Sequence, residues 1–197
     1  MTIIALTVLA IVFLAQLLIP KARFATKRNG LLLFVAASIA VFGNAVWLSV
    51  SQYHLWLSSG VGKFFLPPYQ SFDYFVFYSR ARFFDPYLLS FLLGILFLIG
   101  AAVLNRNYGE LFFEPIEPYL FGTALLLGGT PGWFAYGAVL FTLFFLEVLS
   151  VTIYAVGIRK QAPPRVGLYY LWLPAGIFTI MISRWLSMLP WWQMLRF

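Results

Sequence analysis

The chain contains no cysteine, and its only histidine is His54. The lack of cysteine excludes disulfide frameworks, thiol nucleophiles, iron–sulfur clusters and thiolate zinc sites. A single histidine excludes a bis-histidine haem or a multi-histidine metal centre within one chain. We therefore predict no metal and no cofactor.

Charge is also scarce. Charged residues make up 10% of the 197 residues and hydrophobic residues 62%, against about 25% and about 45–50% in soluble domains. Apolar runs separated by short loops predict an all-α fold, a polytopic transmembrane helix bundle that forms one domain over 1–197 in the lipid bilayer. About six spanning helices are expected, at 2–20, 31–50, 87–104, 111–129, 133–157 and 167–189.

The net charge of +7 comes mostly from basic residues in short loops. Such residues indicate membrane topology better than a nucleic-acid surface, so we predict no nucleic-acid partner. With the N-terminus outside, four loop cations face outward and eight face the cytoplasm, namely Lys21, Arg23, Lys27, Arg28, Arg106, Arg159, Lys160 and Arg165. This asymmetry predicts a cell (inner) membrane protein with both termini on the non-cytoplasmic side.

The connection between the second and third predicted helices, residues 51–86, is unusually rich in aromatic side chains. Pro67-Pro68 interrupts any continuous helix there. Because Tyr and Trp prefer the membrane–water interface, we predict an interfacial or re-entrant segment.

Glu147 is the only acidic residue in the apolar run 133–157. An ionised carboxylate near the bilayer midplane is costly unless it is protonated, paired or hydrated, so an acid in this place is a candidate functional residue. This residue gives the sequence its main candidate site.

Four further residues are predicted to line a ligand site with Glu147. Ser150 and Tyr154 lie on the same stripe of the fifth helix, and Asn44 lies mid-membrane on the second helix. Arg184 in the sixth helix is the candidate ion-pair partner of Glu147, and the alternative is that it extends to the outer headgroups.

Glu114 and Glu117 are the catalytic candidates, in the sequence GELFFEPIEPYLFG. Residues three apart share a helix face, so both carboxylates would point the same way. Acids beside Pro115 or Pro118 are ordinary at a helix start, and we favour this explanation. The alternative is an acid/base or cation-binding pair, which requires one raised pKa.

Small residues predict faces on which helices pack closely. On the third and sixth helices these residues are Ser90, Gly94, Ala101, Gly176, Thr179, Ser183 and Ser187.

Three stretches of the second half follow one another in order: YLFGTALLLGGTPG, IRKQAPPR at a helix end, and GLYYLWLPAGIF at the start of the last helix. In this layout residues 88–190 resemble the prepilin peptidase family. That family has a GxGD motif with a catalytic aspartate, where this chain has EPIEP with Glu117 at the nearest position. The resemblance therefore implies a degenerate relative without the catalytic motif.

Three functions stay open on this basis. The preferred one is a ligand- or ion-binding membrane module of a transport system, built around Glu147. The alternatives are a non-catalytic subunit or assembly factor that meets other membrane subunits, and a degenerate prepilin-peptidase-like intramembrane protein. An enzyme is the less favoured class.

Overall fold

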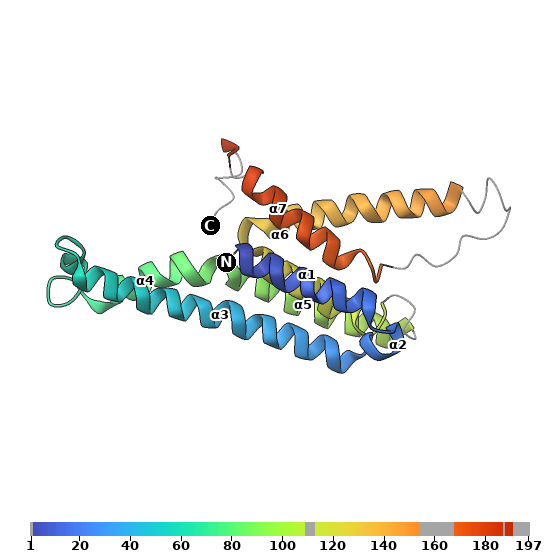
Figure 1. The fold of residues 1–197 in the computed structure, drawn as a ribbon, viewed down its shortest axis with the longest axis horizontal. Helices are drawn as coiled ribbons and strands as arrows, with labels where there is room; N and C mark the ends of the chain where they lie inside the picture. The colour runs from blue at the N-terminus through green and yellow to red at the C-terminus, as the bar shows by residue number, and fades with distance from the viewer. Residues whose placement is uncertain (1, 109–112, 154–167, 187, 191–197) are drawn as a thin grey trace.

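The computed structural model describes residues 2–108, 113–153, 168–186 and 188–190, and every regular element in them is a helix. In chain order the elements are α1 (Thr2–Leu18), α2 (Lys21–Phe24), α3 (Lys27–Ser58), the 3-10 helix η1 (Gly62–Phe65), α4 (Phe72–Ser79), the π-helix η2 (Arg80–Phe84), α5 (Asp85–Tyr108), α6 (Glu117–Thr152) and α7 (Trp172–Leu186). They form an elongated bundle (Figure 1). The predicted all-α fold is confirmed for the described residues.

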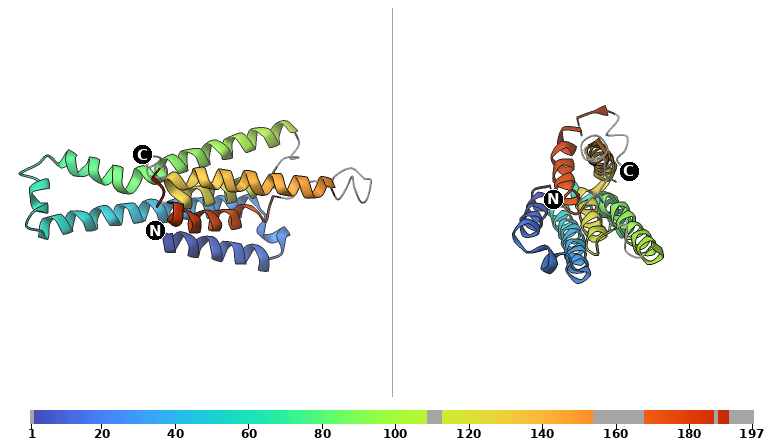
Figure 2. Two further views of the ribbon diagram at one scale, coloured as in Figure 1. Left: turned by 90° about the horizontal axis from the view of Figure 1, so that it is seen from above. Right: turned by 90° about the vertical axis from the view of Figure 1, so that its right-hand side faces the viewer.

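The long helix α6 turns back on itself near Gly129. The ring centroids of Phe121 and Tyr136 lie 5.5 Å apart. The same stretch of straight helix would separate the two residues by about 22 Å. Gly129 has a φ of 60°, a left-handed conformation that glycine adopts without steric cost. Figure 1 and the left view of Figure 2 show the two halves running antiparallel, as the break predicted between 111–129 and 133–157 requires.

The half before the turn, residues 117–128, is the centre of the bundle, and we call it the first arm. Leu120, Thr123 and Leu126 on this arm are all 0% exposed. Its twelve residues cover about 18 Å, less than a hydrocarbon core of about 30 Å. The helix is shorter than the predicted span because a turn at 114–117 precedes it. We call the half of α6 after the turn, residues 132–152, the second arm.

Small residues allow neighbouring helices to pack closely against the first arm. A Cβ added at Gly94 of α5 would lie 3.5 Å from the Cα of Gly122, and one added at Gly176 of α7 would lie 2.9 Å from the Cβ of Ala124. The predicted small-residue faces are confirmed, since their buried members are Ser90, Gly94, Ala101, Gly176 and Thr179. Ser187 lies outside the described residues.

Residues 51–84 form an aromatic lobe that stands beyond the other helices, at the left of Figure 1. The lobe is a continuation of two helices of the bundle, because α3 continues past residue 50 and α4 runs through η2 into α5. Trp56 is its centre, with ring centroids 4.8 Å from Tyr78 and 5.6 Å from both Phe65 and Phe75. These ring contacts hold the two helices together beyond the other helices, and the interfacial or re-entrant placement of this segment stays a prediction.

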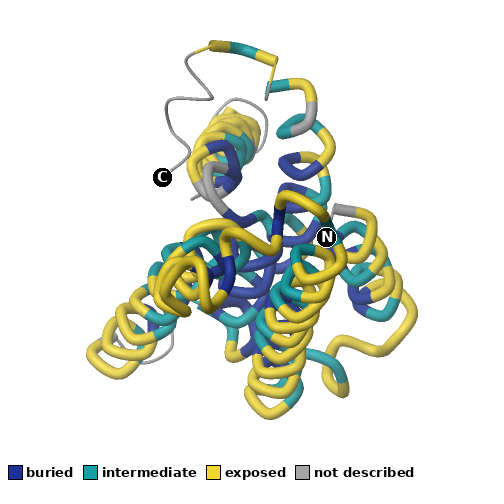
Figure 3. Tube along the Cα trace, turned by 90° about the vertical axis from the view of Figure 1, so that its left-hand side faces the viewer, coloured by how far each residue is buried: buried dark blue, intermediate teal, exposed yellow. Residues whose placement is uncertain are grey.

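Among the residues that the structure describes, two helical runs are long and apolar enough to cross a membrane, Lys27–Ser58 and Phe72–Asn107. The other apolar helices, Ile3–Leu18, Phe134–Ser150 and Trp172–Ser183, are shorter. Large apolar side chains also cover much of the outer surface, and Figure 3 shows buried residues gathered towards the middle of the bundle. Of the six predicted spans, the structure thus supports two by length.

We expect Gly30→Ala to destabilise the protein. A Cβ added at Gly30 would lie 2.8 Å from the Cδ2 of Tyr119, in the first turn of α6. Overpacking of this kind costs about 1–3 kcal/mol, which thermal unfolding in detergent, followed by circular dichroism, would measure.

Gly43→Ala on the same helix is the matched control, because a Cβ added there meets nothing within 4 Å and alanine favours helix. Equal stability of the two variants would contradict the close packing of α3 on α6.

Candidate functional site

Four of the five predicted ligand-binding residues lie on α3, α6 and α7. Asn44 is half-buried on α3, and Ser150 is exposed near the end of the second arm. Glu147 and Arg184 belong to α6 and α7, but their side chains lie outside the described part of the structure, as does the whole of Tyr154.

The second arm and α3 lie on opposite sides of the bundle, as Figure 1 and the right view of Figure 2 both show. Phe145 and Leu146, the two residues before Glu147, are 57% and 53% exposed. The backbone therefore keeps Asn44 apart from the arm that carries Glu147. A single site that includes both residues gains no support from this arrangement.

Tyr136, which shares the stripe of Glu147, has a structural role. Its side chain is 1% exposed, and its hydroxyl donates to the carbonyl oxygen of Trp172 at 2.9 Å. This bond fixes the start of the second arm to the first turn of α7.

The polar contacts gather instead at one end of the bundle, formed by α2, the start of α3, the end of α5 and the start of α6. We call it the basic end. Glu114 and Glu117 close a turn there. The Glu117 N–H donates to the Glu114 carbonyl oxygen at 3.1 Å, and Oε2 of Glu117 accepts from the Glu114 N–H at 2.8 Å. The second bond ties the carboxylate of Glu117, the first residue of α6, to a backbone donor in the preceding turn, which supports the helix-start explanation.

Lys21 connects this turn to two other elements. Its Nζ lies 2.6 Å from Oε1 of Glu114 and 4.9 Å from the centre of the Tyr169 ring. Nε2 of Gln16 donates to the carbonyl oxygen of Tyr169 at 2.6 Å. Because Tyr169 precedes α7, these contacts hold α1, α2, the start of α6 and the start of α7 together.

Asn105 fixes the end of α5 to the segment that leads into α6. Its Nδ2 donates to the Phe113 carbonyl oxygen at 2.9 Å, and its Oδ1 accepts from the Phe113 N–H at 3.1 Å. Both polar atoms of the amide are thus used to position the chain.

A cavity of about 440 Å³ opens at the basic end, between α3, α5 and the start of α6. Its lining residues are Lys27, Leu98, Ala101, Ala102, Asn105, Arg106, Pro115, Pro118 and Tyr119. The charged side chains of this lining are both cations. No carboxylate of the described residues pairs with Lys27 or Arg106, whereas Lys21 has Glu114.

Three other hollows of the described residues are lined almost entirely by apolar side chains. One of about 550 Å³ lies between the second arm and α7, and two of about 480 Å³ and 320 Å³ lie between α5 and the second arm. The two smaller ones are both bordered by Phe97, Phe113 and Phe121. The three hollows contain no charged lining residue that could orient a ligand. The cavity at the basic end is therefore the candidate functional site.

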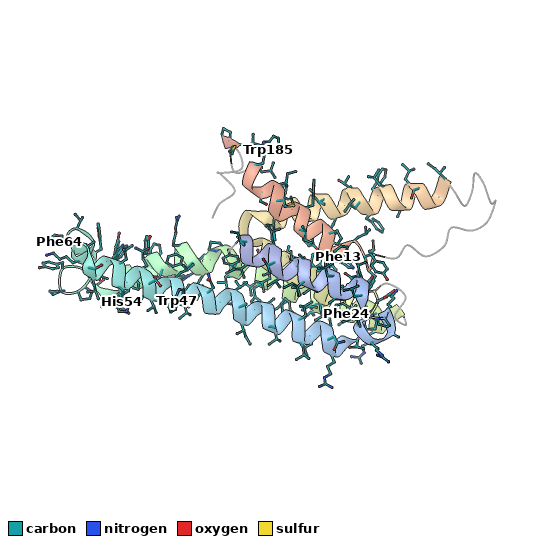
Figure 4. The ribbon with its side chains drawn as sticks, in the orientation of Figure 1. Phe13, Phe24, Trp47, His54, Phe64 and Trp185 are labelled. Atoms are coloured by element: carbon teal, nitrogen blue, oxygen red, sulfur yellow. The ribbon has the colours of Figure 1, made fainter. Side chains whose placement is uncertain are left out.

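No group of three or more His, Cys, Asp or Glu side chains that could hold a metal is found among the described residues. His54 is exposed on the lobe, far from the basic end, where Phe24 lies (Figure 4).

Lys27, Asn105 and Arg106 were not predicted as site residues, because the two cations served only as topology signals. The sequence does contain a signal that would have indicated that the two cations lie close together. Both cations stand just outside an apolar run, so they lie at the same membrane depth if the second and third helices are neighbours. That the two helices form one cavity depends on their packing.

No protein-family model matches the chain, and neither a curated protein nor a solved structure matches it. The resemblance to prepilin peptidases therefore stays a prediction.

We expect Glu117→Ala to destabilise the protein more than Glu114→Gln. The first substitution removes a buried carboxylate acceptor at the helix start and leaves the Glu114 N–H without this partner, a loss of about 1–3 kcal/mol. The second weakens an ion pair whose side chains are 48% and 29% exposed, and such pairs contribute about 0–1 kcal/mol. Thermal unfolding in detergent measures both.

Glu117→Gln is the control, because it keeps an acceptor oxygen and should restore most of the stability. If Glu114→Gln cost as much as Glu117→Ala, the assignment of these roles would be wrong.

Proposed function

We propose that this chain is an integral membrane protein whose six helical passes hold a ligand-binding cavity at the cytoplasmic end of the bundle. The two long apolar helices and the apolar outer surface support membrane insertion. The six passes are α1, α3, α5, the two arms of α6 and α7. The first arm is enclosed by the others, so it need not reach both membrane surfaces.

The distribution of charge supports the orientation. α2, the start of α3 and the end of α5 carry Lys21, Arg23, Lys27, Arg28 and Arg106 at one end of the structure (Figure 1). Cytoplasmic loops are enriched in such residues. The basic end is then cytoplasmic, and the start of α1 and the end of α7 face the other side.

The cavity beside Lys27 and Arg106 is the observation that carries a binding function. The nearby carboxylates of Glu114 and Glu117 are engaged in building the start of α6. Two like charges at one hollow repel each other, and a bound anion would remove that repulsion. The proposed role is therefore binding rather than acid/base chemistry. The proposed ligand site is therefore at the basic end and not at Glu147, and the proposal does not include a role in transport.

A second candidate function, a subunit of a membrane complex, is favoured by the aromatic lobe. Leu55, Val61 and Phe77 on this lobe are 60%, 72% and 70% exposed. Exposed apolar surface of this kind is typical of protein–protein contacts.

The orientation can be tested by cysteine labelling, because the chain has no cysteine of its own. We expect Gly60→Cys on the lobe to react with an impermeant thiol reagent in intact cells, and Ala22→Cys on α2 to be shielded. Both positions are exposed on the protein surface. Permeabilised cells, in which both variants should react, provide the control, and the opposite pattern in intact cells would reverse the topology.

Binding can be tested by mass spectrometry of small molecules released from the protein after purification in mild detergent. Ala102 is exposed and lines the cavity, so Ala102→Trp should fill the hollow while leaving the charges in place. We expect a species present in stoichiometric amounts with the wild type and depleted at least tenfold in the variant.

Gly43→Trp is the matched control, since it adds the same side chain to an open position on α3. Identical ligand content in wild type and Ala102→Trp would contradict the binding function. A stoichiometric protein in place of a small molecule would favour the subunit role.

A further inference from the structure

The two cations of the cavity lie at the depth of lipid phosphates if α3 and α5 span the membrane. Lys27 precedes the apolar run that begins at Leu31 by four residues, or about 6 Å of helix. Arg106 follows Leu104, the end of the other apolar run, by two residues, or about 3 Å. Both charged groups are therefore within reach of the headgroup layer of the cytoplasmic leaflet.

The other wall of the cavity extends into the apolar layer. Leu98 lies eight residues before Arg106 on α5, or about 12 Å deeper along the helix. Between them Ala101 and Ala102 have short side chains, which leaves the hollow open along the helix. The cavity thus has a cationic end at the membrane surface and an apolar side towards the membrane interior.

We infer that this cavity binds a membrane amphiphile with an anionic phosphate headgroup, and this inference rests on the proposed function. The phosphate lies between Lys27 and Arg106, and an acyl chain lies against Leu98 and Ala101. Guanidinium and ammonium groups both bind phosphate oxygens. Basic pockets between membrane helices on the cytoplasmic side are suited to anionic headgroups. A free phosphate would leave the apolar wall unused.

The test uses the purified full chain in mild detergent and measures dissociation constants by calorimetric titration. Dioctanoyl phosphatidylglycerol is the probe. Dioctanoyl phosphatidylcholine has the same chains and phosphate but no net charge, and glycerol 3-phosphate has the charge without chains. We expect the wild type to bind phosphatidylglycerol at least tenfold more tightly than either.

The combined variant Lys27→Gln/Arg106→Gln should bind phosphatidylglycerol about thirtyfold more weakly. Lys63→Gln/Arg82→Gln removes the same charge from the lobe and should leave binding unchanged. Circular dichroism and gel filtration check that each variant is folded. Ala102→Trp gives an independent test, because it should weaken the binding of phosphatidylglycerol without a change in charge.

Wild-type affinity in Lys27→Gln/Arg106→Gln would overturn the inference, and so would an equal loss in the lobe variant. Equal binding of glycerol 3-phosphate would contradict the need for an acyl chain and identify a soluble phosphate as the ligand. Equal binding of phosphatidylcholine would contradict the need for an anionic headgroup. If Ala102→Trp depletes a copurified species that carries no phosphate, the inference fails while the proposed binding function stands.

Discussion

The packing of the first arm of α6 among the other helices is the interaction on which the rest of the structure depends. The arm is short and almost wholly buried, and α5 and α7 reach it closely because Gly94 and Gly176 have no side chain to keep them away. The turn before the arm and its first residues bring Pro115, Pro118 and Tyr119 against α3 and α5, where they complete the cavity. The end of the first arm at Gly129 sends the second arm back along the bundle. One buried helix therefore sets both the position of the cavity and the path of the chain that follows.

The basic end separates the carboxylates from the cavity. Glu114 pairs with Lys21, and Glu117 accepts a backbone hydrogen bond in the turn before α6, so both contribute to the start of the helix. Lys27 and Arg106 have no such partner among the described residues and border the hollow instead. An acid/base role of Glu114 and Glu117 would require one of their carboxyl groups to face a ligand, and neither residue lines the cavity. The arrangement presents cations, which suit the recognition of an anion.

The aromatic lobe and the outer surface of the bundle have different physical roles. Exposed aliphatic and aromatic side chains along the helices are stable next to lipid, which needs no hydrogen bonds from them. The lobe projects beyond the other helices, and the rings around Trp56 give it a core of its own. Its exposed apolar side chains, among them Leu55, Val61 and Phe77, are the surface on which the proposed subunit role rests.

Local sequence determined the helices, the break before the second arm, the helix start at Glu114 and Glu117, and the small-residue faces, because each depends on residues within a few positions of one another. The sequence also placed Lys27 and Arg106 at the ends of apolar runs. Only the tertiary structure decided that these two cations share a cavity, that Tyr136 bonds to Trp172, and that Asn44 lies across the bundle from the second arm. The periodicity of a helix shows which of its faces is apolar or small. Which helix covers that face depends on the fit of side chains from segments far apart in the chain, and here that fit placed the cavity between α3 and α5.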